Sequence, residues 1–303
     1  MDIKNSNAIN RILPGLAIVG YIVYSGYKKK SLSKDGAIAA LLVAMISVYA
    51  NNSFAAQLLL FYYSSSKLTK FKSSVKKQLE DQHQEGGNRN YTQVLSNSAP
   101  AVVYCLLYHF TTNRLTTYVD YTYDYYGSFL IVAVLAHFAC CNGDTWASEL
   151  GILSSSNPIL ITKLRRVPKG TNGGVSTLGL FASLAGGLFI GFVQYISTMI
   201  YSSFYPDEIQ KLQLTNQFFS ILLISSFAGL FGSILDSILG ATLQYSVWSE
   251  KKQLILCDDN IEKTDKKEVK HISGYKVLDN HQVNFLSSLA TALICAYFGY
   301  YIF

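Results

Sequence analysis

The sequence predicts an all-α protein, a polytopic integral membrane bundle with about eight membrane helices (range about six to nine), since about 20 residues span the hydrocarbon core. Hydrophobic residues make up 50% of the 303 residues and charged residues 15%, and the mean hydropathy is +0.22. Soluble domains carry about 25% charged residues, so the deficit favours a membrane protein. We expect a single membrane domain, residues 1–303.

The predicted helices correspond to apolar runs at residues 9–27, 36–50, 54–66, 91–110, 127–142, 174–201, 217–245 and 283–303. The first run ends at three lysines. The second and third runs are short, and Asn51-Asn52-Ser53 between them predicts a tight turn. We favour a helical hairpin here over one long, interrupted helix. A glycine pair interrupts the polar stretch before the fourth run, and a tyrosine-rich link precedes the fifth.

Basic residues are concentrated in every second connection. The connections after runs one, three, five and seven, at about residues 28–35, 67–92, 143–173 and 246–282, hold 21 of the 25 Lys and Arg residues. Cytosolic loops are the loops enriched in bases, so we expect these four on the cytosolic face and both termini on the other face. The alternative for each basic run is an anchor for a helix end at lipid headgroups.

A carboxylate motif follows the fifth run, beginning with the pair Asp144-Thr145. On a helix, Asp144, Ser148 and Gly151 would share one face, with Glu149 at its flank. Mg²⁺ prefers one or two carboxylates together with substrate phosphates, so Asp144 is a candidate metal ligand. The alternative is that Asp144 caps a helix that starts at Thr145.

Positive charge and exposed backbone donors come next, and both suit phosphate. Arg grips phosphate oxygens with two hydrogen bonds, and the glycine-rich stretch 169–174 precedes a predicted helix, whose first N–H groups and dipole favour anions. The stretch is not a Walker A motif. The candidate phosphate- and nucleotide-binding residues are Lys163, Arg165, Arg166, Gly170, Thr171, Asn172, Gly173 and Gly174.

The last three runs carry small or polar residues at helical spacing. Small residues four apart in run six permit close helix packing; they are Gly179, Ser183, Gly187 and Gly191. Run seven places Asp236 among glycines, and an ionisable residue at membrane depth is costly and often functional, so we take it as a second metal or phosphate-site ligand. At the start of run eight, Asp279, Asn280 and Asn284 either cap the helix or contact a substrate headgroup.

The chain resembles the transmembrane protein 19 family in the strings GDTWASELG (143–151), RRVPKGTNGGVSTLG (165–179), GSILDSILGATLQY (232–245) and VLDNHQVNFLSS (277–288). The strings SSSKLTKFK (64–72) and EGGNRNYTQV (85–94) extend the resemblance to most of the chain from about residue 32. The wider family includes plant phytyl-phosphate kinases, which convert an isoprenyl monophosphate to its diphosphate. The arrangement is similar, more loosely, to CTP-dependent polyprenol kinases such as dolichol kinase.

The resemblance implies roles for residues of this chain. It implies that Asp144 and the loop 169–174 handle nucleotide phosphates, with Asp236 and Asn280 nearby. We take Asp144, Glu149 and Lys169 as candidate catalytic residues, and Asp144 and Asp236 as candidate ligands of Mg²⁺. The implied phosphoryl donor is CTP or ATP. Trp146 and the pair at 171–172 follow the animal-type branch of the family.

The leading hypothesis is therefore a kinase for a phytyl, farnesyl or geranylgeranyl monophosphate, on the cytosolic face of the endoplasmic reticulum or another endomembrane. Its partners would be the lipid bilayer, the isoprenyl monophosphate and a nucleotide; nucleic acid is not expected. Phosphoryl transfer needs mainly positioning and charge stabilisation, and an acceptor that is already anionic needs no strong base. The alternatives are a transporter or flippase for a phosphorylated lipid, and a non-catalytic scaffold.

The predicted topology has a direct consequence for the sequon Asn90-Tyr91-Thr92. Because we place this sequon in the cytosol, away from the glycosylation machinery, it should stay unmodified. Glycosidase treatment of protein expressed in eukaryotic cells should leave its electrophoretic mobility unchanged. A glycan on Asn90 would show that this segment lies on the opposite face of the membrane, and that the predicted topology is inverted.

Overall fold

The structure is a computed structural model of the whole chain. It describes all residues except 1–2, 80, 82–86, 113–116, 205–215 and 257–267, and it describes the backbone but not the side chains of 3–11, 201–202 and 204. Most of the described chain is helical. The helices are α1 (Ile3–Lys28), α2 (Lys34–Ala50), α3 (Asn52–Lys70), α4 (Ser73–Lys76), α5 (Tyr91–Ser96), α6 (Ala99–Thr111), α7 (Tyr125–Gly151), α8 (Thr177–Phe204), α10 (Phe218–Leu243) and α12 (Asn280–Gly299).

Each predicted apolar run contains a helix, but run four is divided. It forms α5 and α6, and Pro100 stands in the first turn of α6. Proline has no N–H to donate to the preceding turn, so it suits the start of a helix and not the interior. Runs two and three form the expected hairpin of α2 and α3, because Asn51 ends α2 and its side chain caps α3 by accepting from the Ser53 N–H.

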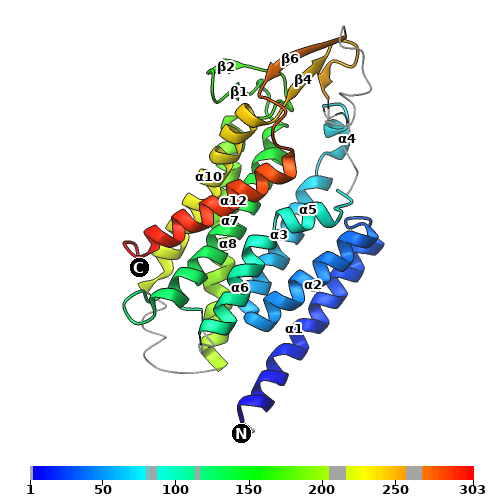
Figure 1. Cartoon of the computed structure of the whole chain (residues 1–303). Coiled ribbons are helices and arrows are strands. Elements are labelled where there is room, and N and C mark those ends of the chain that lie inside the picture. The colour runs from blue at the N-terminus through cyan, green and yellow to red at the C-terminus, as the bar shows by residue number, and fades with distance from the viewer. Residues whose placement is uncertain (1–2, 80, 82–86, 113–116, 205–215, 257–267) are drawn as a thin grey trace.

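Four helices in the described part of the chain are long and apolar enough to cross a membrane: α7, α8, α10 and α12. α6 is apolar but shorter, and α1, α2 and α3 fall outside the criteria of length and hydropathy. The count of about eight membrane helices therefore stays a prediction. The described residues of the four basic connections lie toward one end of the bundle, and the N-terminal end of α1 and the C-terminal end of α12 lie toward the other (Figure 1).

The helix α7 is the centre of the bundle and contacts α3, α6, α8, α10 and α12. Its side chains from Ile131 to Ala139 are 0% exposed, and they form the main hydrophobic core with residues of the surrounding helices. Burying apolar area contributes about 25 cal/mol per Å². A helix that is apolar on all sides is expected at such a central position.

Two small antiparallel sheets lie together at one end of the bundle (Figure 1). The first has the order β2-β1-β3, and the second has the order β5-β4-β6. The all-α prediction missed both, because strands of two to five residues are too short for an alternating pattern to show. The strands are β1 (Ile159–Leu160), β2 (Arg165–Arg166), β3 (Gly174–Val175), β4 (Ser246–Ser249), β5 (Leu254–Ile255) and β6 (Val269–Ser273).

Glycines bring α7, α8 and α10 into backbone contact. A Cβ added at Gly229 of α10 would lie 2.5 Å from the Ser183 carbonyl oxygen and 2.8 Å from the Gly187 Cα, both in α8. A Cβ added at Gly143 of α7 would lie 2.7 Å from the Gly229 Cα. These distances are shorter than van der Waals contact, so only glycine permits the approach. The small residues of run six therefore have the packing role that their spacing predicted.

A buried amide adds a polar link at the same level of the bundle. The Asn142 Nδ2 donates to the Gly186 carbonyl oxygen at 2.7 Å, and the Asn142 Oδ1 accepts from the Ser64 Oγ at 2.8 Å. These bonds join α7 to α8 and to α3. Since Asn142 is fully buried, both bonds also satisfy groups that would be costly to leave unpaired.

Replacing Gly229 with Ala should destabilise the protein by about 1–3 kcal/mol, the usual cost of overpacking a close contact. The matched control is Gly20→Ala in α1, where an added Cβ would meet no atom within 4 Å. Thermal unfolding in detergent would compare the two variants with the wild type. Equal midpoints for all three proteins would contradict the backbone contact.

Candidate active site

A cavity of about 590 Å³ lies between the bundle and the two sheets. Its walls come from α7, α8, α10 and α12, and its rim comes from the segment 169–176, from Ile255 of β5 and from the following Leu256. The volume is in the range of small-molecule sites, about 300–1,000 Å³. Most of the residues predicted for a site from the sequence line this cavity.

Asp144 and Asp236 line the cavity from two different helices, α7 and α10. Asp144 is inside α7, so the alternative that it caps a helix is wrong. Ser148 and Gly151 line the same cavity, as helical periodicity predicted. Asp144 and Asp236 are both half-buried residues.

Each carboxylate accepts a hydrogen bond from a serine of a neighbouring helix. The Ser233 Oγ of α10 donates to the Asp144 Oδ1 at 3.1 Å, and the Ser287 Oγ of α12 donates to the Asp236 Oδ2 at 3.1 Å. These bonds fix the carboxylates while leaving other oxygen lone pairs available to a ligand. The sequence analysis missed both serines, although Ser233 stands one turn before Asp236 on the same helix.

Two asparagines of α12 complete this side of the cavity. Asn280 and Asn284 line it, and with its amide nitrogen turned toward α10, Asn284 donates to the Asp236 Oδ2 at 3.2 Å. Asp279 is outside the cavity lining. Its side chain accepts from the Gln282 N–H at 2.8 Å, and the Gln282 side chain accepts from the Asp279 N–H, so these two residues form a capping box. Of the two roles predicted for Asp279, the structure shows the cap.

The glycine-rich loop 169–174 forms the rim opposite α12, and every residue in it lines the cavity. Gly170 and Gly173 have φ of +83° and +76°, a backbone region that favours glycine. Gly173 also lies against α10, because an added Cβ would be 2.5 Å from the Ser237 carbonyl oxygen. The loop is therefore held tightly on the helix that carries Asp236.

The loop does not lead directly into a helix, which differs from the prediction. Gly174 and Val175 form β3, and α8 begins at Thr177. The Ser176 Oγ accepts from the Gly179 N–H at 3.1 Å, so a side chain already satisfies one of the first N–H groups of α8. Phosphate at this rim would meet the loop backbone before it met the helix dipole.

The charge of the cavity lining is negative among the described residues. Its acidic residues are Asp81, Asp144 and Asp236, and Lys169 is its lysine. Asp81 pairs with Lys252, whose Nζ lies 2.7 Å from the Asp81 Oδ1. The Lys169 Nζ donates to the Ser154 carbonyl oxygen at 2.5 Å. A polyphosphate entering this cavity would face the two membrane carboxylates unless a cation neutralised them.

A family-level comparison matches residues 17–292 of the chain to a family described as integral membrane protein DUF92. The chain belongs to the integral membrane protein DUF92 family. This match confirms the class of protein that the sequence predicted and agrees with the family resemblance drawn from its motifs. No solved structure matches the chain.

Relatives of this DUF92 protein occur in plants, archaea and cyanobacteria. Protein PGR of Arabidopsis thaliana is 39% identical over 293 residues, which cover 97% of this chain and 98% of that protein. An uncharacterized membrane protein of Methanocaldococcus jannaschii is 23% identical over 244 residues, 80% of this chain and 88% of that protein. An uncharacterized membrane protein of Synechocystis is 33% identical over 115 residues, 38% of each chain.

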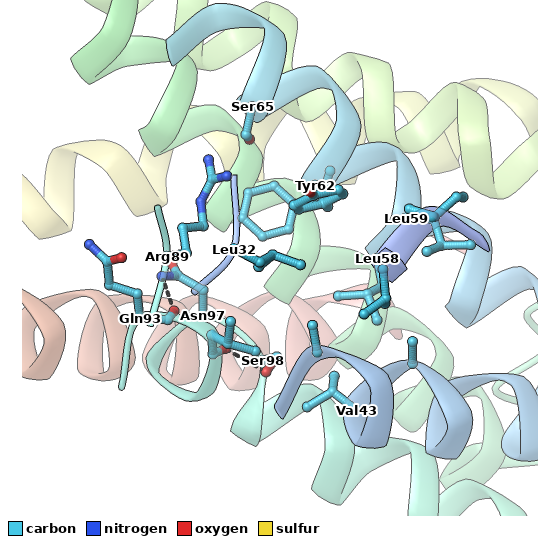
Figure 2. Close-up of a pocket in the computed structure, with 16 residues that line it drawn as sticks. Leu32, Val43, Leu58, Leu59, Tyr62, Ser65, Arg89, Gln93, Asn97 and Ser98 are labelled. Carbon is cyan, nitrogen blue, oxygen red and sulfur yellow. Dashed lines mark hydrogen bonds between the residues drawn. The ribbon is translucent and has the colours of Figure 1, made fainter. Parts of the chain in front are cut away.

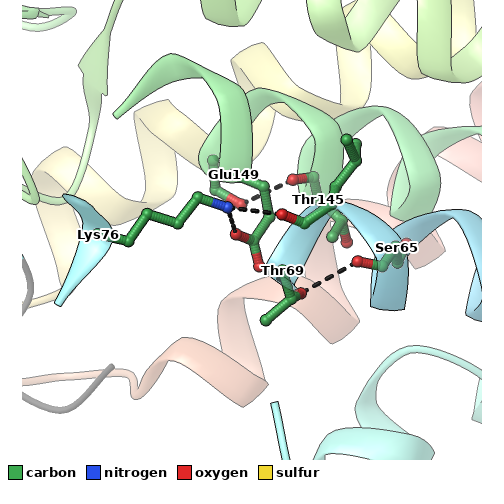
Figure 3. Close-up of polar contacts among 7 residues, drawn as sticks. Ser65, Thr69, Lys76, Thr145 and Glu149 are labelled. Carbon is green, nitrogen blue, oxygen red and sulfur yellow. Dashed lines mark hydrogen bonds and ion pairs between the residues drawn. The ribbon is translucent and has the colours of Figure 1, made fainter. Parts of the chain in front are cut away.

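The candidate catalytic residue Glu149 does not line the cavity of the DUF92 protein. Because α7 continues to Gly151, Glu149 lies about 140° around the helix from Asp144, at about 100° for each of five residues. It faces α3 and α4, where it pairs with the Lys76 Nζ and accepts from the Thr69 Oγ1 at 2.5 Å (Figure 3). The Lys76 side chain is 0% exposed. This geometry shows a structural ion pair between α4 and α7.

The predicted phosphate-binding bases Lys163, Arg165 and Arg166 also lie outside the cavity lining. They belong to the hairpin of β1 and β2, which turns at Leu164 with φ of +49°. All three are exposed, and the Arg165 Nη2 donates to the Ile272 carbonyl oxygen at 3.2 Å. Their exposure fits the alternative that basic runs meet lipid headgroups at the membrane surface.

Breaking the Lys76–Glu149 pair should destabilise the protein and leave the cavity intact. Removing one partner of a buried pair costs about 3–5 kcal/mol, so Lys76→Met and Glu149→Gln should each lower the unfolding midpoint in detergent. The double variant should lose less than the sum of the two single variants, because the charge that each single variant leaves behind, on Glu149 or on Lys76, is removed as well. Strict additivity would show that the two side chains do not interact.

Proposed function

We propose that this DUF92 protein is a kinase that converts an isoprenyl monophosphate to the diphosphate with a nucleoside triphosphate. The observation that carries the proposal is the meeting of Asp144, Asp236 and the glycine-rich loop 169–174 in one cavity at the end of a membrane bundle. The family membership and the similarity along nearly the whole length of Protein PGR support a membrane-bound activity shared with relatives.

The two carboxylates suit Mg²⁺ bound together with phosphates. The described residues contain no group of three or more His, Cys, Asp or Glu side chains that would hold a metal by themselves. Mg²⁺ commonly uses one or two carboxylates and completes its shell with substrate phosphates and water, so Asp144 and Asp236 fit it. When bound, the ion would neutralise the phosphate charge that the negative cavity otherwise repels.

The remaining residues of the cavity would hold and orient the two carboxylates and the phosphates. Ser233 and Ser287 fix the two carboxylates by hydrogen bonds, and Asn280 and Asn284 offer amide groups on the side of α12. The loop 169–174 offers backbone N–H groups to phosphate oxygens. Lys169 adds positive charge at the same rim. This arrangement supplies positioning and charge stabilisation, which are the main requirements of phosphoryl transfer.

The proposed reaction is balanced without a protein nucleophile. An oxygen of the acceptor phosphate forms a bond to the terminal phosphorus of the nucleotide, and the bond from that phosphorus to its bridging oxygen breaks. The products are the isoprenyl diphosphate and a nucleoside diphosphate. CTP and ATP both supply this chemistry. We place the reaction at the cytosolic face of an endomembrane, because nucleotide is available there and the basic connections lie at this end of the bundle.

Replacing Asp144 or Asp236 with Asn should lower diphosphate formation on the order of a hundredfold or more, because charge stabilisation of the transferred group is the largest contribution. Purified protein would be mixed with Mg²⁺, CTP or ATP, and phytyl, farnesyl or geranylgeranyl monophosphate. Mass spectrometry would detect the diphosphate. The matched control is Glu250→Gln, an exposed acid outside the cavity lining, which should keep wild-type activity.

Removal of Mg²⁺ with a chelator should abolish product formation, and added Mg²⁺ should restore it. Glu149→Gln should retain activity in the fraction that remains folded, because Glu149 lies outside the cavity. Absence of diphosphate with every donor and acceptor, in wild-type protein shown to be folded, would contradict the proposal. Movement of unchanged isoprenyl phosphate across liposomes in that case would favour a transporter.

A further inference from the structure

A second cavity, of about 70 Å³, lies among α1, α2, α3 and α5 (Figure 2). Its walls are mostly aliphatic and include Leu32, Val43, Leu58 and Leu59. This volume is several times the roughly 10–15 Å³ needed to admit one water, so a small group fits in the cavity. An apolar cavity of this kind stays dry and takes apolar ligands, so its walls favour a short hydrocarbon segment.

One end of this cavity carries the guanidinium of Arg89, a half-buried residue. Arg89 lines the cavity beside Tyr62, and its Nη1 donates to the Ser66 Oγ at 2.8 Å. Its backbone is fixed, because the Arg89 N–H donates to the Ser31 carbonyl oxygen at 3.0 Å and the Arg89 carbonyl accepts from the Ser33 N–H at 3.0 Å. The guanidinium is therefore held in place before any ligand arrives, with most of its five N–H donors still available.

A hydroxyl group at the same end has no hydrogen-bond partner in the described structure. Ser65 lines the cavity and is 1% exposed, and its Oγ is without a partner. A buried polar atom of this kind costs about 1–3 kcal/mol unless something satisfies it. A ligand with a polar end next to an apolar chain would satisfy it.

The charges around this polar end favour an anion. Arg89 and Lys76 both interact with the single carboxylate of Glu149, so two cations share one anion. Gln93 connects this arrangement to the candidate active site, because it lines both the small apolar cavity and the large polar cavity. The small apolar cavity and the large polar cavity therefore meet at Gln93.

We propose that this apolar cavity, together with Arg89, is the acceptor subsite of the kinase. The cavity takes the five-carbon unit of the isoprenyl chain nearest the phosphate, and the rest of the chain passes between the helices into the bilayer. Arg89 binds the acceptor phosphate, and Gln93 stands between it and the nucleotide cavity. This inference rests on the proposed function and adds to it, since it assigns acceptor binding to Arg89 in place of the exposed bases at 163–166.

The test is photolabelling, which needs binding but no turnover. The protein would be reconstituted in liposomes with a farnesyl monophosphate analogue that carries a diazirine in its first isoprene unit, and labelled peptides would be mapped. Ala40→Phe should fill the cavity, because Ala40 is half-buried and lines it. The matched control is Ala39→Phe, one position along α2, half-buried and outside the lining.

We expect labelling within α1, α2, α3 and α5 in the wild type. Arg89→Gln should reduce it about tenfold or more, as expected for loss of a charge-assisted contact. Ala40→Phe should reduce it as well, because the phenylalanine occupies the cavity, and Ala39→Phe should not. Ala40→Leu provides a milder filling variant if the phenylalanine impairs folding, and Arg89→Lys should restore part of the labelling. Unfolding midpoints would show that each compared variant is folded.

Labelling outside these helices, or equal labelling of Ala40→Phe and the wild type, would overturn the acceptor subsite. Diphosphate formation would be measured on the same samples. Diphosphate formation by a protein whose labelling maps elsewhere would contradict the acceptor subsite and support the kinase proposal. Labelling in the cavity without diphosphate formation would support binding of the isoprenyl phosphate at this cavity and contradict the kinase proposal.

Discussion

The structure depends on the backbone contact among α7, α8 and α10. Gly143, Gly187 and Gly229 let the three helices approach more closely than any side chain would permit. Asp144 follows directly after this contact on α7, and Asp236 stands about two turns beyond it on α10. The contact therefore sets where both carboxylates lie, and the two small sheets and α12 close the cavity around them.

The basic residues of this protein differ in how far they are buried. The exposed bases of the β1–β2 hairpin lie at the surface, while the buried Lys76 and the half-buried Arg89 associate with Glu149. The large polar cavity has carboxylates with serine and asparagine partners. A site that is negative by itself accepts phosphate only with a cation, so the divalent ion is an essential part of the proposed chemistry.

The sequence predicted the long helices well, because continuous apolar runs of membrane length are a strong signal. It also singled out Asp144, Asp236, Asn280 and the loop 169–174, which the structure places at one cavity. It ended the fifth apolar run at Asn142, because a Gly and two polar residues at 142–144 resemble a helix end, whereas α7 continues to Gly151. It placed Glu149 at the flank of the Asp144 face, but the partners that turn Glu149 toward α3 and α4, Thr69 and Lys76, come from a distant segment. The strands were too short to detect, and Arg89 lies in a polar stretch whose partners come from distant segments.

The central claim is that Asp144, Asp236 and the glycine-rich loop hold the nucleotide phosphates. The most direct measurement is an experimental structure, by electron cryo-microscopy, of the protein in lipid with Mg²⁺ and a non-hydrolysable analogue of CTP or ATP. We predict density for the phosphates between the loop 169–174 and the two carboxylates. Density for the nucleotide at the exposed hairpin of Arg165 and Arg166, with the cavity empty, would contradict the account.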